Sequence, residues 1–564
     1  MEPSAQITRR DALRALAAVG VAAGSAAGAP RTEGALREPD PESPLERNDA
    51  AVRRLLAQQL VNPASPGCGC VPDPFGFHTA GSASGVVETL TASFVHPQSA
   101  FHRDPELRRR IDLAAGFLER AQTPQGNVDL LVTNFNSPPD TAFVTHNVAT
   151  AAAIARRGGA EDIAERLRPF LEKAGAAMAV GGIHTPNHRW VVCAALAQVH
   201  ELFPDPRYVA RIDEWLAEGI DIDADGQFIE RSTLTYNPIT DRALVVVATK
   251  LDRPALLEPV RRNLRALTWL LHADGEVVTE ISKRQDQYTR GNVARYWFPL
   301  TFLARLDKDG QFATLARQAE PTGARLSTLL EYPELADALV PSQPLPNDFV
   351  KEMPAIGITR IRRGPRSATL LLGGTSRLLT LRSGEVVLDG LRMASAFFGK
   401  AQFIPDTVER RDGSYLLRQK LEAPYYQPVS ERVAPEAWLE VRARRPQSEI
   451  CHFEQSAEIT ETERGLKVRL RAHGTDGVPV AVELSFRAGG QLTGCSSLEG
   501  EPDCALLASG EATYRVGSNA IRVGPGAAPH RYTQVRGAEP RLLGQSVYVT
   551  GFTPFDHTLE LECD

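Results

Sequence analysis

Cysteine, methionine and tryptophan are scarce in this chain of 564 residues, which contains 7, 4 and 5 of them, respectively. So few cysteines exclude a scaffold that depends on disulfides, although Cys495 and Cys504 could close one small loop. Cys68 and Cys70 stand close together but lack the two further ligands that a zinc site needs. The sequence therefore predicts no metal site and no cofactor.

A strong charge of one sign is also missing, because 63 Lys and Arg residues face 69 Asp and Glu residues and leave a formal net charge of −6. Such a surface has no field that would hold a polyanion along its whole length. We therefore expect no nucleic-acid partner, and an acidic ligand must be bound by a local site. With 43% hydrophobic and 23% charged residues, the composition is that of ordinary globular domains and says nothing about oligomeric state.

Long apolar runs are absent too, since no stretch reaches the roughly 18 apolar residues of a transmembrane helix. The N-terminus carries the pair Arg9-Arg10, followed by an uncharged, alanine-rich stretch over 15–29. This pattern is typical of a twin-arginine export signal, with a membrane anchor as the alternative. We expect residues 1–29 to be removed and the mature protein to be periplasmic or secreted, without stable membrane association.

In the rest of the chain, the predicted secondary structure changes once, from helices to strands. Residues 45–340 show helical periodicity, the proline-rich stretch 341–353 predicts a linker, and 354–564 consists of short alternating runs that predict strands. Helices followed by strands, rather than alternating with them, favour two segregated domains. The fold class expected is a multidomain α+β protein, helical first and antiparallel β second.

The helical part repeats. Ser137-Pro138, Thr185-Pro186 and Asn237-Pro238 each combine a capping residue with proline at the first helical position, and the prolines are 48 and 52 residues apart. Asp286 is a further possible cap. About 50 residues is the size of one helix hairpin with its loops, and stacked hairpins form a solenoid or a ring. The polar segments before the four caps should therefore emerge at one end of the domain.

Those segments contain the candidate site. Asn187 and His188 lie in the first turn after Thr185, where free backbone N–H groups and the helix dipole favour an anion and disfavour an imidazolium. A neutral histidine beside a carboxylate-binding position is what a general base requires. Tyr236 stands one repeat later, before Asn237.

The Asn187-His188 pair, Tyr236 before Asn-Pro, the helix hairpins and the following β domain resemble the heparinase II/III-like and alginate lyase group of polysaccharide lyases. The resemblance implies an α/α toroid, an incomplete ring of helix hairpins, followed by an antiparallel β-sandwich. It implies β-elimination at C4 of a uronic acid, with Asn187 neutralising the substrate carboxylate, His188 assisting proton transfer and Tyr236 acting as base or acid.

The chemistry suits these residue types, because the C5 proton lies α to a carboxylate and charge develops there as it leaves. A phenol suits proton delivery to the departing O4 oxygen, and it becomes a base only beside cations. Group members commonly supply a further histidine from the β domain, but 370–405 contain none, and Lys400 or Arg392 could substitute. The residues expected to bind the uronate-containing polysaccharide or oligosaccharide are Asn134, Asn136, Arg231, Arg284, Gln285, Tyr288 and Lys400.

Two other functions stay open. A toroid glycoside hydrolase would draw paired acids from Asp140, Asp223, Glu230 and Asp286, whereas turn composition predicts Asp223 and Glu230 to be turn or cap acids. A carbohydrate-binding protein would keep the cleft without the chemistry. The histidines within helical patterns, predicted to be structural, are His146, His200 and His272.

Overall fold

The computed structural model describes residues 43–564, so the predicted export signal lies outside the described residues. The described chain forms two compact units. One comprises the residues up to Leu271 together with Gly275–Leu345, and the other comprises His272–Asp274 and Pro346–Asp564. Among residues 43–564, no helix combines the length and the apolar character needed to cross a membrane.

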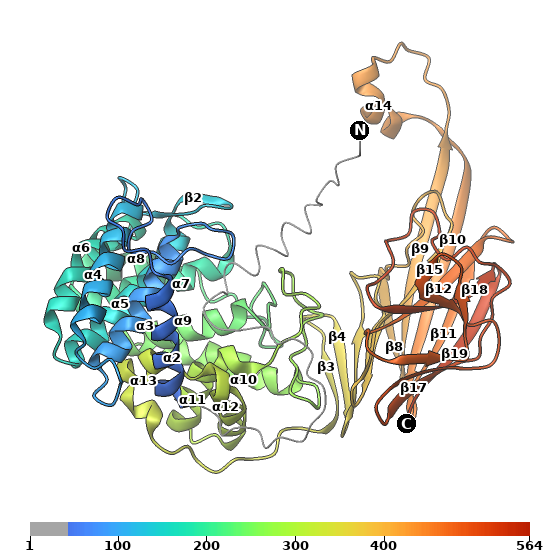
Figure 1. The fold of residues 1–564 in the computed structure, drawn as a ribbon. Helices are drawn as coiled ribbons and strands as arrows, with labels where there is room; N and C mark the ends of the chain where they lie inside the picture. Colours follow the sequence, from blue (N-terminus) through green and yellow to red (C-terminus); the bar gives the residue numbers. More distant parts are fainter. Residues whose placement is uncertain (1–42) are drawn as a thin grey trace. The chain divides into compact units, whose positions relative to one another are not determined.

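The first unit is built from helix hairpins and one small β-hairpin (Figure 1). Its helices are α2 (Pro44–Gln58), α3 (Ala80–Val95), α4 (Pro105–Ala121), α5 (Pro138–Arg157), α6 (Glu161–Met178), α7 (Pro186–Leu202), α8 (Pro206–Ala217), α9 (Tyr236–Lys250), η1 (Pro254–Leu256), α10 (Leu257–Trp269), η2 (Val293–Tyr296), α11 (Trp297–Leu306), α12 (Gly310–Gly323), α13 (Leu326–Glu331) and η3 (Pro333–Ala336). Strands β1 (Val128–Leu130) and β2 (Asn134–Ser137) form the hairpin before α5.

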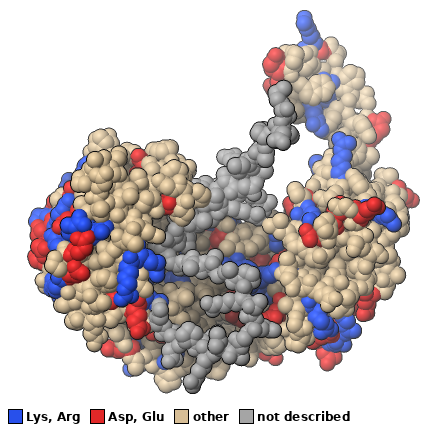
Figure 2. All heavy atoms as spheres, in the orientation of Figure 1, with Lys and Arg blue, Asp and Glu red and all other residues tan. Residues whose placement is uncertain are grey.

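Two classes of helix alternate along this unit. Helices α3, α5, α7 and α9 are buried over most of their length and contact one another in that order. Helices α4, α6, α8 and α10 are amphipathic and bury one stripe, as in α8, where only Tyr208 and Ile212 are fully buried. Figure 2 shows basic and acidic side chains intermixed on the outer face of α4 and α6, where ion pairs such as Arg108–Asp162 connect the two helices.

The end of the helical unit returns to its beginning. Helix α13 packs against α2, α3 and α5, and Arg47 of α2 donates a 2.9 Å hydrogen bond to the carbonyl of Ala324. On α13, Glu331 is buried, pairs with Lys250 of α9 at 3.1 Å and accepts a 2.8 Å bond from Thr150 of α5. The last and the first hairpins are thus joined by the single short helix α13 and not by a further hairpin. This arrangement confirms the predicted toroid, an incomplete ring of helix hairpins.

Two of the predicted helix starts are wrong. Ser137 does cap α5, accepting from the N–H of Asp140 at 3.3 Å. Helix α9, however, begins at Tyr236 and not after Asn237, because Ser232 accepts from the N–H groups of both residues, through its hydroxyl and its carbonyl. Asp286 caps no helix. Helix α11 begins only at Trp297, and Asp286 instead accepts hydrogen bonds from Ser232, Ser282 and the N–H of Leu234 within the loop.

The second unit contains two sheets. The nine-stranded sheet has the order β14-β15-β18-β12-β7-β6-β5-β4-β3, and the eight-stranded sheet has the order β13-β16-β17-β19-β11-β10-β9-β8. Neighbours pair antiparallel except β15 and β18. The strands are β3 (Asp348–Met353), β4 (Ile358–Arg363), β5 (Arg366–Leu371), β6 (Leu379–Ser383), β7 (Val386–Ser395), β8 (Thr407–Arg411), β9 (Ser414–Tyr426), β10 (Gln447–Glu461), β11 (Gly465–His473), β12 (Pro479–Phe486), β13 (Gln491–Thr493), β14 (Ser496–Leu498), β15 (Glu501–Leu506), β16 (Ala512–Val516), β17 (Asn519–Gly524), β18 (Gln545–Phe552) and β19 (Phe555–Cys563). The connection between β9 and β10 carries η4 (Pro435–Ala437) and α14 (Trp438–Arg444).

Apolar side chains from both sheets share one core, with Leu391 and Leu484 from the first sheet and Leu417 and Leu559 from the second fully buried in it. This packing confirms the predicted β-sandwich. The predicted linker over 341–353 is too long, because β3 occupies its second half and pairs with β4. All seven cysteines carry free thiols, so Cys495 and Cys504 form no disulfide in this structure.

Candidate active site

Three loops meet at one end of the helical unit. Because α5, α7 and α9 alternate with the outer helices in hairpins, they run in the same direction, and the loops before them emerge together. Side chains and backbone connect these loops: a Cβ on Gly181 would fall 2.5 Å from Pro138, and the N–H of Lys283 donates a 3.0 Å bond to the carbonyl of Glu230. The predicted common end is thus present for the polar segments 184–190, 230–237 and 282–288.

Glu230 connects two repeats at the start of α7. Its Oε2 atom accepts bonds from the side-chain amide of Asn187 at 2.7 Å and from the Asn187 N–H at 3.2 Å. Thr185 holds the capping position but its side chain makes no capping bond. A carboxylate from the next repeat therefore satisfies one of the free N–H groups at the positive end of α7.

Arg284 is the cation of the site. One of its guanidinium nitrogens lies 3.1 Å from Oε1 of Glu230, and the guanidinium carbon lies 4.8 Å from the centre of the Tyr236 ring. Burial raises the pKa of Glu230, although the bonds from Asn187 and the charge of Arg284 act in the opposite direction. Arg284 thus joins Glu230 and Tyr236 in one cluster.

His188 is neutral in this setting. The ring is buried, stacks edge-on against His184 with centroids 4.7 Å apart and packs near Phe143. Burial, with smaller contributions from His184 and Arg284, lowers the pKa of His188 to about 3. Its Nδ1 atom is buried and has no hydrogen-bond partner among the described residues.

Tyr236 begins α9 and is partly exposed. Its hydroxyl accepts a 2.6 Å bond from the side-chain amide of Gln285, which is itself exposed. Since a phenol oxygen that accepts from an amide still carries its own proton, the hydroxyl can donate to a ligand. The structure thus brings together Asn187, His188, Tyr236, Arg284 and Gln285.

The side chain of Asn187 is oriented differently from the expectation. Its amide donates to Glu230 at 2.7 Å and to the hydroxyl of Thr185 at 3.2 Å, so the atom left without a partner is the buried acceptor Oδ1. The nitrogen and oxygen of an asparagine are assigned from such networks, and a carboxylate partner requires the nitrogen on its side. In this state the Asn187 amide is not available to neutralise a second carboxylate.

Two predicted binding residues belong to the β1–β2 hairpin and have internal partners. Asn134 donates to the carboxylate of Asp140 at 2.9 Å. Asn136 adopts a left-handed backbone with φ of 47°, and its side-chain oxygen accepts from Thr123 at 2.7 Å and Asn127 at 3.2 Å. These bonds stabilise the hairpin, so Asn136 is not shown to join the Asn187 cluster.

The other predicted binding residues are Arg231, Tyr288 and Lys400. Arg231 and Tyr288 are half-buried and have positive φ angles of 51° and 61°, which turn the chain after Glu230 and after Asp286. Lys400 is exposed in the second unit, and its role stays a prediction. Arg392 is buried in ion pairs with Glu483 and with Glu539, the latter at 3.2 Å, and therefore serves the sandwich.

The four acids considered for a hydrolase have different environments. Asp140 binds Ser137 and Asn134, Asp223 accepts from the N–H groups of Asp225 and Gln227, and Asp286 is buried in its loop. Asp140 and Asp223 stabilise their own turns, whereas Asp286 also joins its loop to the loop before α9 through Ser232 and Leu234. Of the four, Glu230 contacts the cluster. It does act as a cap acid, but at the start of α7 in another repeat, where it accepts from the N–H of Asn187.

The histidines predicted to be structural bond to protein groups. His146 contacts Gln198 at 2.6 Å, His200 accepts from the N–H of Asp205 at 3.1 Å, and His272, in the second unit, contacts Ser367 at 2.9 Å. Within residues 43–564, no group of three His, Cys, Asp or Glu side chains is arranged to hold a metal ion.

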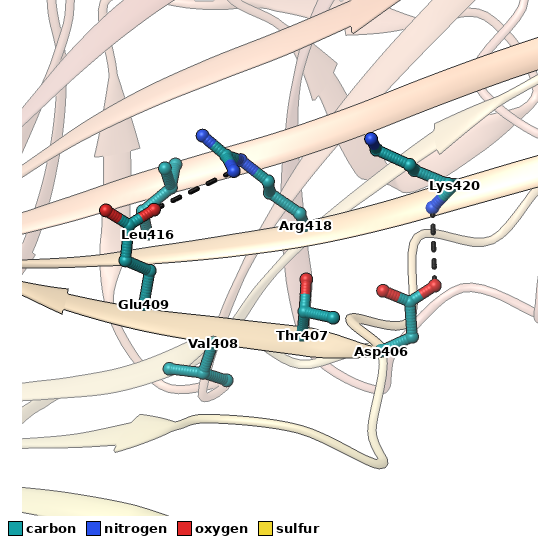
Figure 3. Close-up of a pocket in the computed structure, with 7 residues that line it drawn as sticks. All are labelled: Asp406, Thr407, Val408, Glu409, Leu416, Arg418 and Lys420. Atoms are coloured by element: carbon teal, nitrogen blue, oxygen red, sulfur yellow. Dashed lines mark hydrogen bonds and ion pairs between the residues drawn. The ribbon is translucent and has the colours of Figure 1, made fainter.

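A hollow of about 520 Å³ lies elsewhere, at the edge strand β8 of the second unit. Figure 3 shows an ion pair of Arg418 with Glu409, at 3.7 Å, and a hydrogen bond from the backbone N–H of Lys420 to Asp406, at 3.3 Å. The ammonium of Lys420 lies 3.8 Å from Glu454. Its charges compensate one another, and its lining contains no histidine, tyrosine or cysteine. It offers no chemistry comparable to that of the Asn187 cluster.

No protein-family model matches the chain, and no curated protein matches it in sequence. Among solved structures, a chondroitin AC lyase from Streptomyces coelicolor A3 in complex with chondroitin sulphate matches with a TM-score of 0.51 and 15% identity, over 93% of this chain and 80% of that one. A xanthan lyase from Paenibacillus matches with a TM-score of 0.53 and 9% identity, over 92% of this chain and 56% of the other. The chain therefore shares the α/α toroid and β-sandwich fold of these polysaccharide lyases, as its sequence resemblance predicted.

Proposed function

We propose that the chain is an exported polysaccharide lyase that cleaves a uronate-containing polysaccharide or oligosaccharide by β-elimination. The observation that carries the proposal is the gathering of a neutral histidine, a partly exposed phenol and a guanidinium at one end of the toroid, at His188, Tyr236 and Arg284. The fold shared with two polysaccharide lyases supports it.

The proposed reaction needs a base, an acid and a cation that holds the substrate carboxylate. A base removes the C5 proton, the C4–O4 bond breaks as the C4=C5 double bond forms, and an acid protonates the departing O4. Arg284 would hold the uronate carboxylate while charge develops on it, and Tyr236 would deliver the proton to O4. His188 is a weak base when buried beside Arg284, but a carboxylate bound next to it favours the imidazolium and so raises its pKa.

The environments of the acids favour elimination over hydrolysis. A glycoside hydrolase needs two carboxyl groups on opposite sides of the scissile bond. Of the four acids considered, Asp140 and Asp223 are engaged in their own turns, and Asp286 is buried and accepts bonds from Ser232, Ser282 and the N–H of Leu234. Glu230 is the one of the four that binds Asn187 and lies against Arg284. A hydrolase built on these residues would lack its second acid.

Exposed apolar side chains support a polymeric ligand. Phe75 precedes α3 and is 57% exposed, and Phe135 precedes α5 and is 69% exposed. Leu131, Val180 and Ile229 are also exposed in the loops before α5, α7 and α9. The two flat phenylalanine rings suit the faces of sugar rings on either side of the cleaved bond, and the aliphatic side chains add apolar surface around the polar centre.

Export remains a proposal from the Arg9-Arg10 segment. The enzymatic proposal is tested by incubating the full mature chain with alginate, heparosan, hyaluronan and glucuronan and recording ultraviolet absorbance. A lyase produces an unsaturated uronate that absorbs. Saturated fragments would instead establish a hydrolase, and an intact polymer that binds to the protein would establish a carbohydrate-binding protein.

A further inference from the structure

The start of α7 is an anion-binding position that the chain itself fills. Three groups converge there: the N–H of Asn187, the amide of Asn187 and the guanidinium of Arg284. Each of them is of the type that binds a carboxylate, and the helix dipole adds to their effect. The carboxylate that they bind belongs to Glu230, which comes from the loop before α9.

Glu230 is held closely in this position. It is buried, and its two oxygens are divided between Asn187 and Arg284. Asp221, a second acid near Glu230, forms an ion pair with Arg189 at 2.9 Å. Arg284 is thus already paired with an internal carboxylate, and a substrate carboxylate on the same guanidinium would arrive as a second negative charge.

We propose that Glu230 is a specificity-determining residue that competes, within the chain, with the carboxylate of the substrate for Arg284 and Asn187. This inference rests on the proposed function. A uronate that binds at the reacting position must displace Glu230 from Arg284 or be accompanied by a proton on Glu230. A neutral sugar in the same position meets no such competition, so Glu230 sets the relative affinity for acidic and neutral rings.

The magnitude follows from the repulsion between like charges. Two carboxylates in contact with one cation in a partly desolvated site repel each other, which weakens the binding of the second one. Substituting Glu230 by Gln removes one of these charges and retains the side-chain length and an oxygen that can accept from Asn187. The affinity for a uronate ligand relative to its neutral counterpart should therefore rise by at least about tenfold.

The test measures the affinities of the wild type and Glu230→Gln by calorimetry at mildly alkaline pH. The probes are tetrasaccharides of alginate, heparosan, hyaluronan and glucuronan, each beside its carboxyl-reduced form. Glu331→Gln is the matched control, because Glu331 is an equally buried, ion-paired glutamate in the ring interior. Glu230→Ala is a second variant that removes the charge and the competing side chain together.

The expected result is a rise in the ratio of acidic to neutral affinity in both Glu230 variants and an unchanged ratio in Glu331→Gln. An unchanged or lower ratio in the two Glu230 variants, with a wild type that forms unsaturated products, would overturn this inference and leave the lyase proposal standing. A wild type that forms no unsaturated product from any of the four polymers would contradict the lyase proposal, and this inference with it.

Discussion

The Oε2 atom of Glu230 lies 2.7 Å from the side-chain amide nitrogen of Asn187, although 43 residues separate the two in sequence. This hydrogen bond connects one helix hairpin to the next at the start of α7. It brings a carboxylate to the positive end of this helix, one residue before the neutral His188. It also connects Asn187, through Glu230, to Arg284 and the ring of Tyr236.

Tyr236→Phe should separate binding from chemistry. The substitution keeps the ring that packs under Arg284 and removes only the hydroxyl, so we expect nearly unchanged substrate affinity and a fall in turnover of about 10²-fold or more. Steady-state kinetics with the polymer that the wild type cleaves measure both quantities. Tyr208→Phe on the outer helix α8 is the control and should keep wild-type turnover; equal turnover in Tyr236→Phe would remove this residue from the mechanism.

His188 should make the stability of the protein depend on pH on the acidic side. Its pKa is about 3 in the folded chain and about 6.5 when unfolded, so between these values the unfolded chain binds a proton that the folded chain does not. The free energy of unfolding should fall as the pH drops from about 6.5, by up to about 1.4 kcal/mol per unit from this group.

Urea unfolding of the wild type and His188→Gln at neutral and mildly acidic pH checks this expectation. The variant should lose less stability on acidification than the wild type. An NMR titration should show no protonation of the His188 ring between neutral pH and about pH 4.5. Protonation of this ring near pH 6.5 would contradict the neutral histidine that the burial predicts.

Arg284→Gln should destabilise the fold through Glu230. The variant leaves a buried carboxylate without its cation, and we expect a loss of about 1–3 kcal/mol in the free energy of unfolding, since Arg284 is partly exposed. The double variant Glu230→Gln with Arg284→Gln should recover part of this loss. Additive losses in the double-mutant cycle would mean that the two side chains do not interact.

Phe75→Ala and Phe135→Ala should weaken the binding of long chains. Both rings are exposed in loops on the site end of the toroid, so their loss should raise KM for polymers severalfold and change KM for the shortest cleaved oligosaccharide little. Leu306→Ala is the control, because Leu306 is exposed at the opposite, C-terminal end of α11. Equal effects of the three variants would remove the apolar loops from substrate binding.

The local signals in the sequence predicted much of the helical frame. Thr185-Pro186 predicted the start of α7, and the spacing of about 50 residues predicted that consecutive polar segments share one end. Both predictions rest on pairs of adjacent residues, in which the first residue caps the helix and the fixed φ angle of the following proline suits the first helical position. The same rule failed at Asn237, because Ser232, five residues earlier, supplies the acceptors that start α9.

The role of Glu230 could not be predicted from its neighbours. In sequence it follows an Asp-Gly turn and has the composition of a loop acid. Its partners, Asn187 and Arg284, lie 43 and 54 residues away on the preceding and following repeats, and only the stacking of the hairpins brings them together. The bond between the Asn187 amide and Glu230 could not be predicted for the same reason, and the role of Asn187 toward a substrate carboxylate stays a prediction.

The mass of the products tests the central claim most directly. The fragments released from a defined uronate oligosaccharide by the purified chain are weighed by mass spectrometry and compared with the parent. β-Elimination transfers a proton within the site and adds no water, so the fragment masses should sum to the mass of the parent, and Tyr236→Phe should form the same fragments far more slowly. Fragments whose masses sum to that of the parent plus one water would contradict the lyase account and establish hydrolysis.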